Sequence, residues 1–293
     1  MPIQRDYIIS LREAGGPRPD QYETLDQWFR NVGALVRQKV LTRNQVRALW
    51  QWFGDAFSSD TLQGFVANKP HDHAGDFEII DRIYTRWISP KKELAKWDEF
   101  FHWQPATEAV RNRKEYFKSL LAELEEAEPG ELFVLNVGSG PCRDLHEYQR
   151  DRPATRMRFE CLDADRKAID YAARLLKGCQ VTFHHRNAFR FKADRKYHLI
   201  WSAGLFDYLS DRQFIFLFRS LWKMVAPGGM LVVGNFSEFN PSRDYMEFGE
   251  WFLHHRSEAQ LIRLAETAGA PPRFITLDRE PTRINLFLRV RKE

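Results

Sequence analysis

The sequence lacks any apolar run of about 18 residues, the length needed to cross a membrane as a helix. It has only three cysteines, Cys142, Cys161 and Cys179, too few and too scattered for a disulfide framework or a paired-cysteine metal site. Residues 1–6 lack the apolar core of a secretory signal, so we expect a cytoplasmic protein. These absences exclude a membrane-spanning protein and a small disulfide-stabilised one.

Aromatic residues, in contrast, are abundant. The 23 phenylalanines and nine tryptophans bring the aromatic content to 14%, which is typical of a large core or of an apolar ligand cavity. The remaining composition, with 43% hydrophobic and 29% charged residues, is ordinary for a globular chain. At 293 residues, the length favours two domains, since a domain averages about 150 residues.

The net charge of +4 is spread unevenly along the chain. Residues 1–129 carry two more acidic than basic side chains, whereas residues 130–293 carry six more basic than acidic ones. The densest basic stretch, residues 186–196, is interrupted by Asn187, Phe189 and Asp194, which favours a solvated face over a nucleic-acid site. We therefore expect no nucleic-acid partner.

Residues 1–129 show helical periodicity throughout. Residues 22–39 place six apolar side chains on one helical stripe, and residues 42–45 form a capping box that opens the next helix. Residues 128–130, Glu-Pro-Gly, are a stop signal. We predict an all-helical domain over residues 1–129, acting as a lid over a substrate site.

After residue 130 the periodicity changes to short apolar runs that alternate with amphipathic helices. The first run is dense enough for a central parallel strand buried on both faces. This alternation predicts an α/β domain over residues 130–293, with a doubly wound, mostly parallel, seven-stranded sheet. The predicted strands are residues 132–137, 157–162, 181–185, 198–202, 230–233, 274–277 and 285–290.

The first strand ends in Gly138-Ser139-Gly140, where small residues let a ligand approach the main chain closely. A dinucleotide site would have a third glycine where Arg143 stands, and the bulk of that side chain weakens the nicotinamide interpretation. Asp163, at the end of the second strand, is placed to accept hydrogen bonds from both ribose hydroxyls of a nucleoside.

The exit of the third strand, residues 186–189, adds a side-chain amide and an aromatic ring that could bracket an adenine. Together the three strand ends favour an adenosyl ligand without a pyrophosphate. A purely structural alternative is that the two glycines only shape a tight turn and that Asp163 only caps the following helix.

These motifs resemble those of the class I S-adenosylmethionine-dependent methyltransferases. The resemblance covers roughly residues 130–293 and rests on five motifs in order, residues 134–140, 161–165, 186–188, 197–202 and 227–231. It implies a Rossmann-like methyltransferase fold and S-adenosyl-L-methionine as cofactor. Asn187 and His198 stand where many members carry aspartate. The implied cofactor-binding residues are Gly138, Ser139, Gly140, Asp163, Ala164, Asn187, Ala188, Ser202 and Ala203.

A narrower resemblance, to bacterial methyltransferases associated with hydroxy-fatty-acid methyl ester signals, rests on residues 74–78, 109–113, 234–236 and 240–247. His73 stands where tyrosine is common in that group. The resemblance implies a small-molecule substrate, O-methylated on a carboxylate and bearing an apolar, acyl-like body.

The nature of the acceptor decides which further residues are needed. A carboxylate is already ionised at neutral pH, whereas an amine, phenol or hydroxyl needs a general base. An acid substrate would be held by a guanidinium fork. The predicted catalytic residues are Tyr208, His73 and Tyr245, and the predicted substrate-binding residues are Arg111, Arg113, Phe206, Arg243 and Trp251.

Several alternatives stay open. The arginines of residues 111–113 could form surface ion pairs, and the region around Trp251 is as readily core as pocket. His71 and His73 lack a third ligand at defined spacing, so we predict no metal. The acceptor could instead be a natural-product amine or phenol, an RNA or a protein, or the chain could sense the cofactor without catalysis. We expect a small-molecule substrate and no membrane span, and leave a homodimer open.

Overall fold

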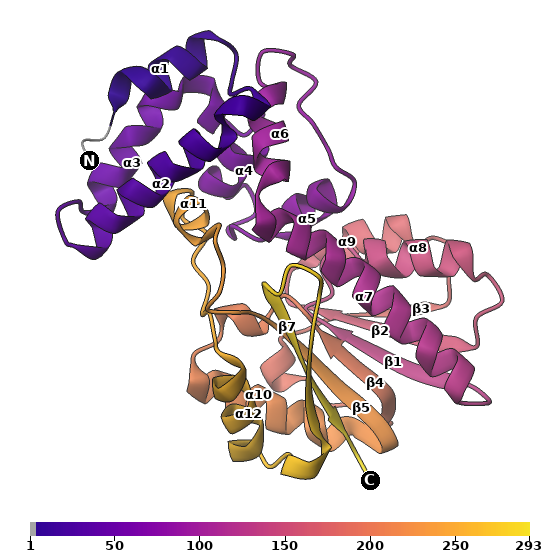
Figure 1. Ribbon diagram of the computed structural model, residues 1–293. Coiled ribbons are helices and arrows are strands. Elements are labelled where there is room, and N and C mark those ends of the chain that lie inside the picture. The colour runs from indigo at the N-terminus through magenta and orange to yellow at the C-terminus, as the bar shows by residue number, and fades with distance from the viewer. Residues whose placement is uncertain (1–3) are drawn as a thin grey trace. The chain divides into compact units, whose positions relative to one another are not determined.

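The computed structural model describes residues 4–293. The expectation of no secretory signal was based on residues 1–6, and the first three of these lie outside the described residues. The chain forms two compact units (Figure 1): a helical unit, up to Glu108 together with Asn240–Phe252, and a sheet unit, Ala109–Phe239 with Leu253–Glu293. No helix within residues 4–293 is long and apolar enough to cross a membrane.

The helical unit is built from the amphipathic helices that the periodicity predicted. α2 (Tyr22–Arg37) buries its apolar stripe, and α3 (Arg43–Phe53) begins with the predicted capping box between Thr42 and Gln45. The other helices of this unit are α1 (Arg5–Glu13), α4 (Leu62–Asn68), α5 (Phe77–Tyr84), α6 (Ala95–Trp103), the first turn of α7 (Pro105–Ala127) and α11 (Arg243–Phe248).

An aromatic cluster forms the core of the helical unit. The ring of Phe29 on α2 lies 5.9 Å from that of Phe53, 4.8 Å from that of Tyr245 and 4.9 Å from that of Phe248, measured between centroids. Such offset and edge-on pairs stabilise a core beyond their burial alone. Because two of these rings come from α11, the segment Asn240–Phe252 is an integral part of the helical unit.

Gly64 on α4 lies directly against the backbone of the preceding turn. A Cβ there would lie 1.9 Å from the Ser58 carbonyl oxygen and 2.5 Å from the Phe57 carbonyl carbon, so Gly64→Ala must push the backbone apart. We expect it to lower the free energy of unfolding by about 2 kcal/mol, as measured by urea denaturation. Gly249→Ala is the matched control, because the nearest atoms would lie 3.6 Å from its Cβ. Equal losses in the two variants would contradict the prediction.

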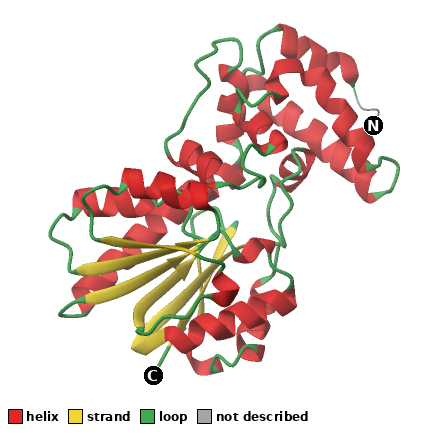
Figure 2. Cartoon of the chain, turned by 180° about the vertical axis from the view of Figure 1, so that it is seen from behind, coloured by secondary structure: helices red, strands yellow, loops and turns green. Residues whose placement is uncertain are grey.

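The sheet unit holds a seven-stranded sheet in the order β3-β2-β1-β4-β5-β7-β6 (Figure 2). β1 to β5 run parallel to one another, and β7 is antiparallel to both β5 and β6. The predicted doubly wound, mostly parallel, seven-stranded fold is confirmed. The strands are β1 (Leu132–Val137), β2 (Met157–Asp163), β3 (Val181–His185), β4 (Tyr197–Ser202), β5 (Val225–Phe236), β6 (Ile275–Arg279) and β7 (Asn285–Arg291).

Helices cover both faces of this sheet (Figure 1). α7, α8 (Arg143–Asp151) and α9 (Arg166–Leu175) pack on one face, where the ring of Phe117 stacks on Trp201 at 4.5 Å. α10 (Asp211–Met224) and α12 (Glu258–Thr267) pack on the other. Burial on both faces explains why the central strands consist almost entirely of apolar residues.

Two boundaries differ from the sequence prediction. The predicted domain boundary at residue 129 follows the change from helix to strand, whereas the compact units divide at Glu108, and α7 beyond it packs on the sheet. β5 is also longer than expected, because the predicted turn at residues 227–229 pairs with the end of the chain. The amide of Gly228 donates to the Lys292 carbonyl, and the amide of Lys292 to the Gly229 carbonyl, both at 2.8 Å.

Candidate functional site

The sheet order reverses between β1 and β4, and in open α/β sheets ligands bind outside the carboxyl ends of the strands at such a point. Gly138 and Gly140, directly after β1, have φ of +64° and +54°, the left-handed region that glycine enters without strain. A Cβ added to Gly138 would lie 3.1 Å from the Leu205 Cβ, whereas one on Gly140 would have no atom within 4 Å. The turn therefore has one packed side and one open side.

The main-chain amides of this turn already have acceptors. Those of Gly138 and Ser139 donate to the Leu162 carbonyl at 2.8 and 3.2 Å, and that of Gly140 donates to Asp163 Oδ2 at 2.9 Å. A pyrophosphate site needs such amides aimed at the ligand. These three amides are consequently not available to a pyrophosphate.

Asp163 links the ends of β1 and β2. Its second oxygen, Oδ1, accepts the amide of Asp165 at 2.9 Å, so the carboxylate is oriented before any ligand arrives. Burial raises its pKa above the usual aspartate range, opposed by the amides of Asp165 and Gly140. A half-buried carboxylate held in this way is an acceptor for ligand hydroxyls.

The neighbouring predicted cofactor residues also lie at this edge of the sheet. The Ser139 hydroxyl is buried with no hydrogen-bond partner, which marks it as a group that a ligand could satisfy. Asn187 uses its side-chain oxygen to cap the amide of Phe189 at 2.9 Å, so only its NH₂ group can face a purine. Ala188 is half-buried and Ala164 is exposed.

The end of β4 is tied to the end of β1 and to α7. The buried Ser202 hydroxyl donates to the Val137 carbonyl at 2.8 Å, and the guanidinium of Arg113 donates from Nη1 to the Ala203 carbonyl. Both Nη atoms of Arg113 lie 3.4–3.7 Å from the position of a Cβ on Gly204. A buried guanidinium thus lies over the strand end at which transfer is expected.

Two buried carboxylates face this guanidinium. Burial raises the pKa of Asp144 on α8 to about 6, and that of Asp207, which follows β4, also to about 6, with the charge of Arg113 opposing the rise in each. Asp207 Oδ1 accepts the amide of Phe236 at 2.6 Å. We call Arg113, Asp144 and Asp207 the Arg113 cluster. It combines one cation with two anions beside the turn after β1 and the loop after β4.

Two predicted acceptor-site residues lie in η4 (Phe206–Tyr208), with different outcomes. Phe206 is fully buried, and its ring packs edge-on against that of Phe214 at 4.8 Å. It belongs to the core beneath α10 and not to the substrate wall that we predicted. Tyr208 is 40% exposed.

Four other predicted residues belong to the helical unit. Tyr245 is core, with its hydroxyl donating to Gln63 Oε1 at 2.9 Å, which leaves no role for it as a base. Arg243 is a surface residue paired with Glu247 at 2.7 Å, and Trp251 is buried. The predicted catalytic and substrate roles of these three therefore have no support. The fourth, His73, is exposed in the loop between α4 and α5.

Arg111, the remaining predicted residue, is buried on α7 in the sheet unit. Two residues apart on a helix means about 200° of rotation, so Arg111 and Arg113 leave α7 in nearly opposite directions. Within residues 4–293 no cluster of three or more acidic, histidine or cysteine side chains could hold a metal ion.

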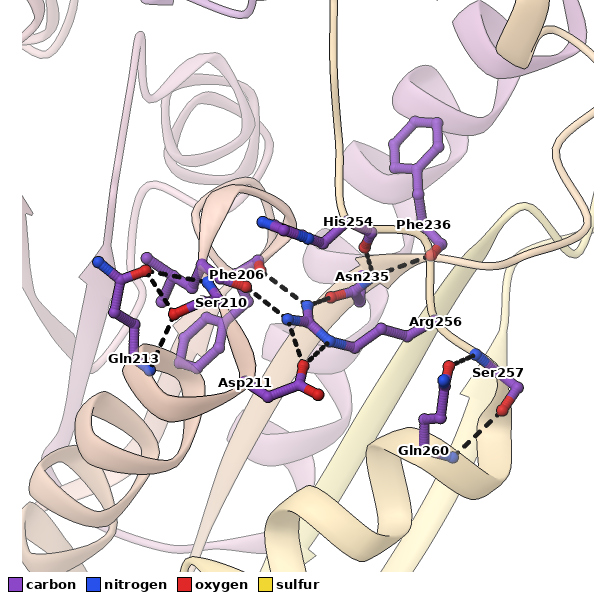
Figure 3. Close-up of polar contacts among 11 residues, drawn as sticks. Phe206, Ser210, Asp211, Gln213, Asn235, Phe236, His254, Arg256, Ser257 and Gln260 are labelled. Atoms are coloured by element: carbon purple, nitrogen blue, oxygen red, sulfur yellow. Dashed lines mark hydrogen bonds and ion pairs between the residues drawn. The ribbon is translucent and has the colours of Figure 1, made fainter. Parts of the chain in front are cut away.

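Sequence reasoning missed Asp144, Asp207 and a buried arginine, Arg256. Arg256 donates to the Phe206 carbonyl, to the side chain of Asn235 and to that of Asp211 (Figure 3). Asp207 lies between two residues that were singled out, but a single aspartate in a loop has no signal that separates it from a solvated one. The same holds for an arginine whose partners are distant in sequence.

Comparison with known protein families gives one match, over part of the sheet unit. Residues 134–229, from β1 to the start of β5, match the family model for a methyltransferase domain, and this stretch contains all nine predicted cofactor residues. No curated protein matches the sequence. Residues 134–229 therefore form a methyltransferase domain, as predicted.

Several solved structures share this fold. A protein of Bordetella parapertussis described as a possible exported protein is 22% identical, with a TM-score of 0.60 over 74% of this chain and 79% of that one. The apo S-adenosylmethionine-dependent methyltransferase SibL is 16% identical, with a TM-score of 0.51 over 89% and 77%. Magnesium protoporphyrin IX methyltransferase of Synechocystis PCC 6803, solved with S-adenosylhomocysteine, is 14% identical, with a TM-score of 0.50 over 64% and 87%. At these identities the likeness shows the fold alone.

Proposed function

We propose that the protein O-methylates a carboxylate on a small molecule with an apolar, acyl-like body. The observation that carries this proposal is the lack of an available base in the loop after β4. Residues 202–209 contain neither histidine nor lysine, and their one carboxylate, that of Asp207, is fully buried on the Phe236 amide. An acceptor that is already ionised needs no base, whereas an amine or phenol does.

The cofactor, when bound, supplies a sulfonium methyl group for in-line displacement, so most of the rate comes from positioning. We assign the open side of Gly140 and the carboxylate of Asp163 to the ribose. Asn187 and Ala188 are assigned to the adenine, and the unpartnered hydroxyl of Ser139 to a polar atom of the cofactor. The buried Ser202 fixes the strand ends that carry these groups.

The Arg113 cluster is assigned to the amino-acid end of the cofactor. That end is a zwitterion, and a guanidinium beside two buried carboxylates complements both of its charges. An acid substrate at Arg113 would be repelled by Asp144 and Asp207. This assignment replaces the sequence-based one, in which Arg113 held the substrate carboxylate.

The acceptor carboxylate is assigned to Arg111 and Tyr208. Arg111 is buried on α7, and Tyr208, in the loop after β4, is 40% exposed. A phenol has a pKa near 10 in water, which makes it a donor to a carboxylate and a poor base at pH 7. Membership of the fatty-acid methyl ester group is part of the proposal and rests on the motifs of the sequence alone.

The test uses the alkali lability of methyl esters. Cell extract is incubated with the protein and with cofactor carrying a deuterated methyl, and labelled products are found by mass spectrometry. We expect mild alkali to release the label as methanol, because an ester hydrolyses whereas a methyl ether or N-methyl group does not. Asp163→Ala is the matched control and should give no labelled product. A label retained after alkali would contradict the carboxylate proposal and favour the amine or phenol alternative.

A further inference from the structure

The loop after β4 is held by a buried arginine from a distant part of the chain. Arg256 lies just before α12 and is only 3% exposed. Its Nη1 donates to the main-chain carbonyl of Phe206 at 3.1 Å, and its Nη2 donates to that of Leu209 (Figure 3). One guanidinium therefore bridges the two ends of a four-residue segment.

The remaining N–H groups of this guanidinium are also satisfied. Nη1 donates to Asn235 Oδ1 at 2.7 Å, and Nε and Nη2 share Asp211 Oδ1 at 3.1 and 3.0 Å. The guanidinium carbon lies 5.1 Å from the ring centroid of Phe214. Because guanidinium geometry is a rigid fork, these contacts fix the direction in which Arg256 holds the loop.

Asp207 anchors the middle of the same segment. Its carboxylate accepts the Phe236 amide at 2.6 Å, and its main-chain carbonyl accepts the His254 amide at 2.7 Å. Residues 206, 207 and 209 are thus each tied to β5 or to the strand-like stretch around Arg256. Tyr208 lies between these anchors and keeps 40% of its side chain exposed.

We propose that Arg256 is a positioning residue for methyl transfer, holding residues 206–209 so that the Tyr208 phenol is presented to the acceptor. The inference rests on the proposed function only in giving Tyr208 to the acceptor. The ion pair with Asp211 contributes little, because that aspartate side chain is 72% exposed. The main-chain carbonyl contacts are therefore what hold residues 206–209 in place.

The test follows Tyr208 directly. The full chain, with its nine tyrosines labelled as 3-fluorotyrosine, gives fluorine NMR signals, and Tyr208→Phe identifies the signal of residue 208. In Arg256→Lys, which keeps the charge but loses the fork, we expect that signal to shift or broaden while the other signals stay in place. S-adenosylhomocysteine affinity should remain within about twofold of wild type. Asp211→Asn, which removes the charge partner and leaves both carbonyl contacts, should leave the Tyr208 signal unchanged.

Two results would overturn the proposal. One is an unchanged Tyr208 signal in Arg256→Lys, and the other is a comparable change in every tyrosine signal, which would indicate a general structural role. Arg256→Ala is a second, stronger variant, and if it fails to fold, Arg256→Lys decides alone. The measurement contains no acceptor, so its failure is distinguishable from failure of the alkali test.

Discussion

Replacing Arg113 by alanine should weaken S-adenosylhomocysteine binding about 100-fold and leave 5′-methylthioadenosine binding within about twofold. The first ligand carries the amino-acid end that we assign to the Arg113 cluster, and the second lacks it. A hydrogen bond to a charged group contributes about 1.5–3 kcal/mol, and its loss leaves a carboxylate beside two buried acids. Calorimetric titration of the variant with both ligands gives the two affinities.

Arg150→Ala is the matched control for this experiment, because Arg150 is a surface residue on α8 paired with Asp151. It should bind both ligands as wild type does. If Arg113→Ala bound S-adenosylhomocysteine normally and raised only the KM for the acceptor, the guanidinium would serve the substrate, as the sequence first suggested.

Replacing Asp163 by alanine should weaken the binding of both ligands, each by about 100-fold, because both contain the ribose. The carboxylate is fixed in place by the amides of Gly140 and Asp165. Weaker binding of S-adenosylhomocysteine with unchanged binding of 5′-methylthioadenosine would contradict the assignment of Asp163 to the ribose.

Asp170→Ala provides the control, since Asp170 lies on the surface of α9 and pairs with Arg166. Its affinities for both ligands should match wild type. Arg113→Ala should weaken only the ligand with the amino-acid end, whereas Asp163→Ala should weaken both ligands. A general loss of stability would not produce this difference.

The sheet and its cofactor turn could be predicted from sequence because their signals are local. Apolar runs mark β1 and β4, and glycines mark the turn at residues 138–140, where left-handed φ values allow little else. Asp163 follows the same logic, since it stands at the end of a predicted strand.

The helical unit and the acceptor side could not be predicted in the same way. Phe206 was predicted to bind substrate and Tyr245 to be catalytic, because an aromatic side chain has the same sequence pattern in a core as in a pocket. The packing of Phe29 against Tyr245 joins residues more than 200 positions apart, and no local period encodes such a contact. It is also what draws the segment Asn240–Phe252 out of the predicted sheet domain.

The buried charges have the same limitation. Asp144, Asp207 and Arg256 are ordinary loop or helix-end residues in the sequence, and only the fold shows that they are buried. Their importance depends on desolvation, which raises both aspartate pKa values to about 6 and which no composition or spacing reveals.

The central claim is that the carboxyl ends of β1, β2 and β3 form a site for an adenosyl ligand without a pyrophosphate. Calorimetric titration of the wild-type protein with S-adenosylhomocysteine and, separately, with NAD tests it most directly. We expect saturable one-site binding of S-adenosylhomocysteine and no heat of binding with NAD, because the turn amides are already engaged within the protein. Binding of NAD without binding of S-adenosylhomocysteine would contradict the claim.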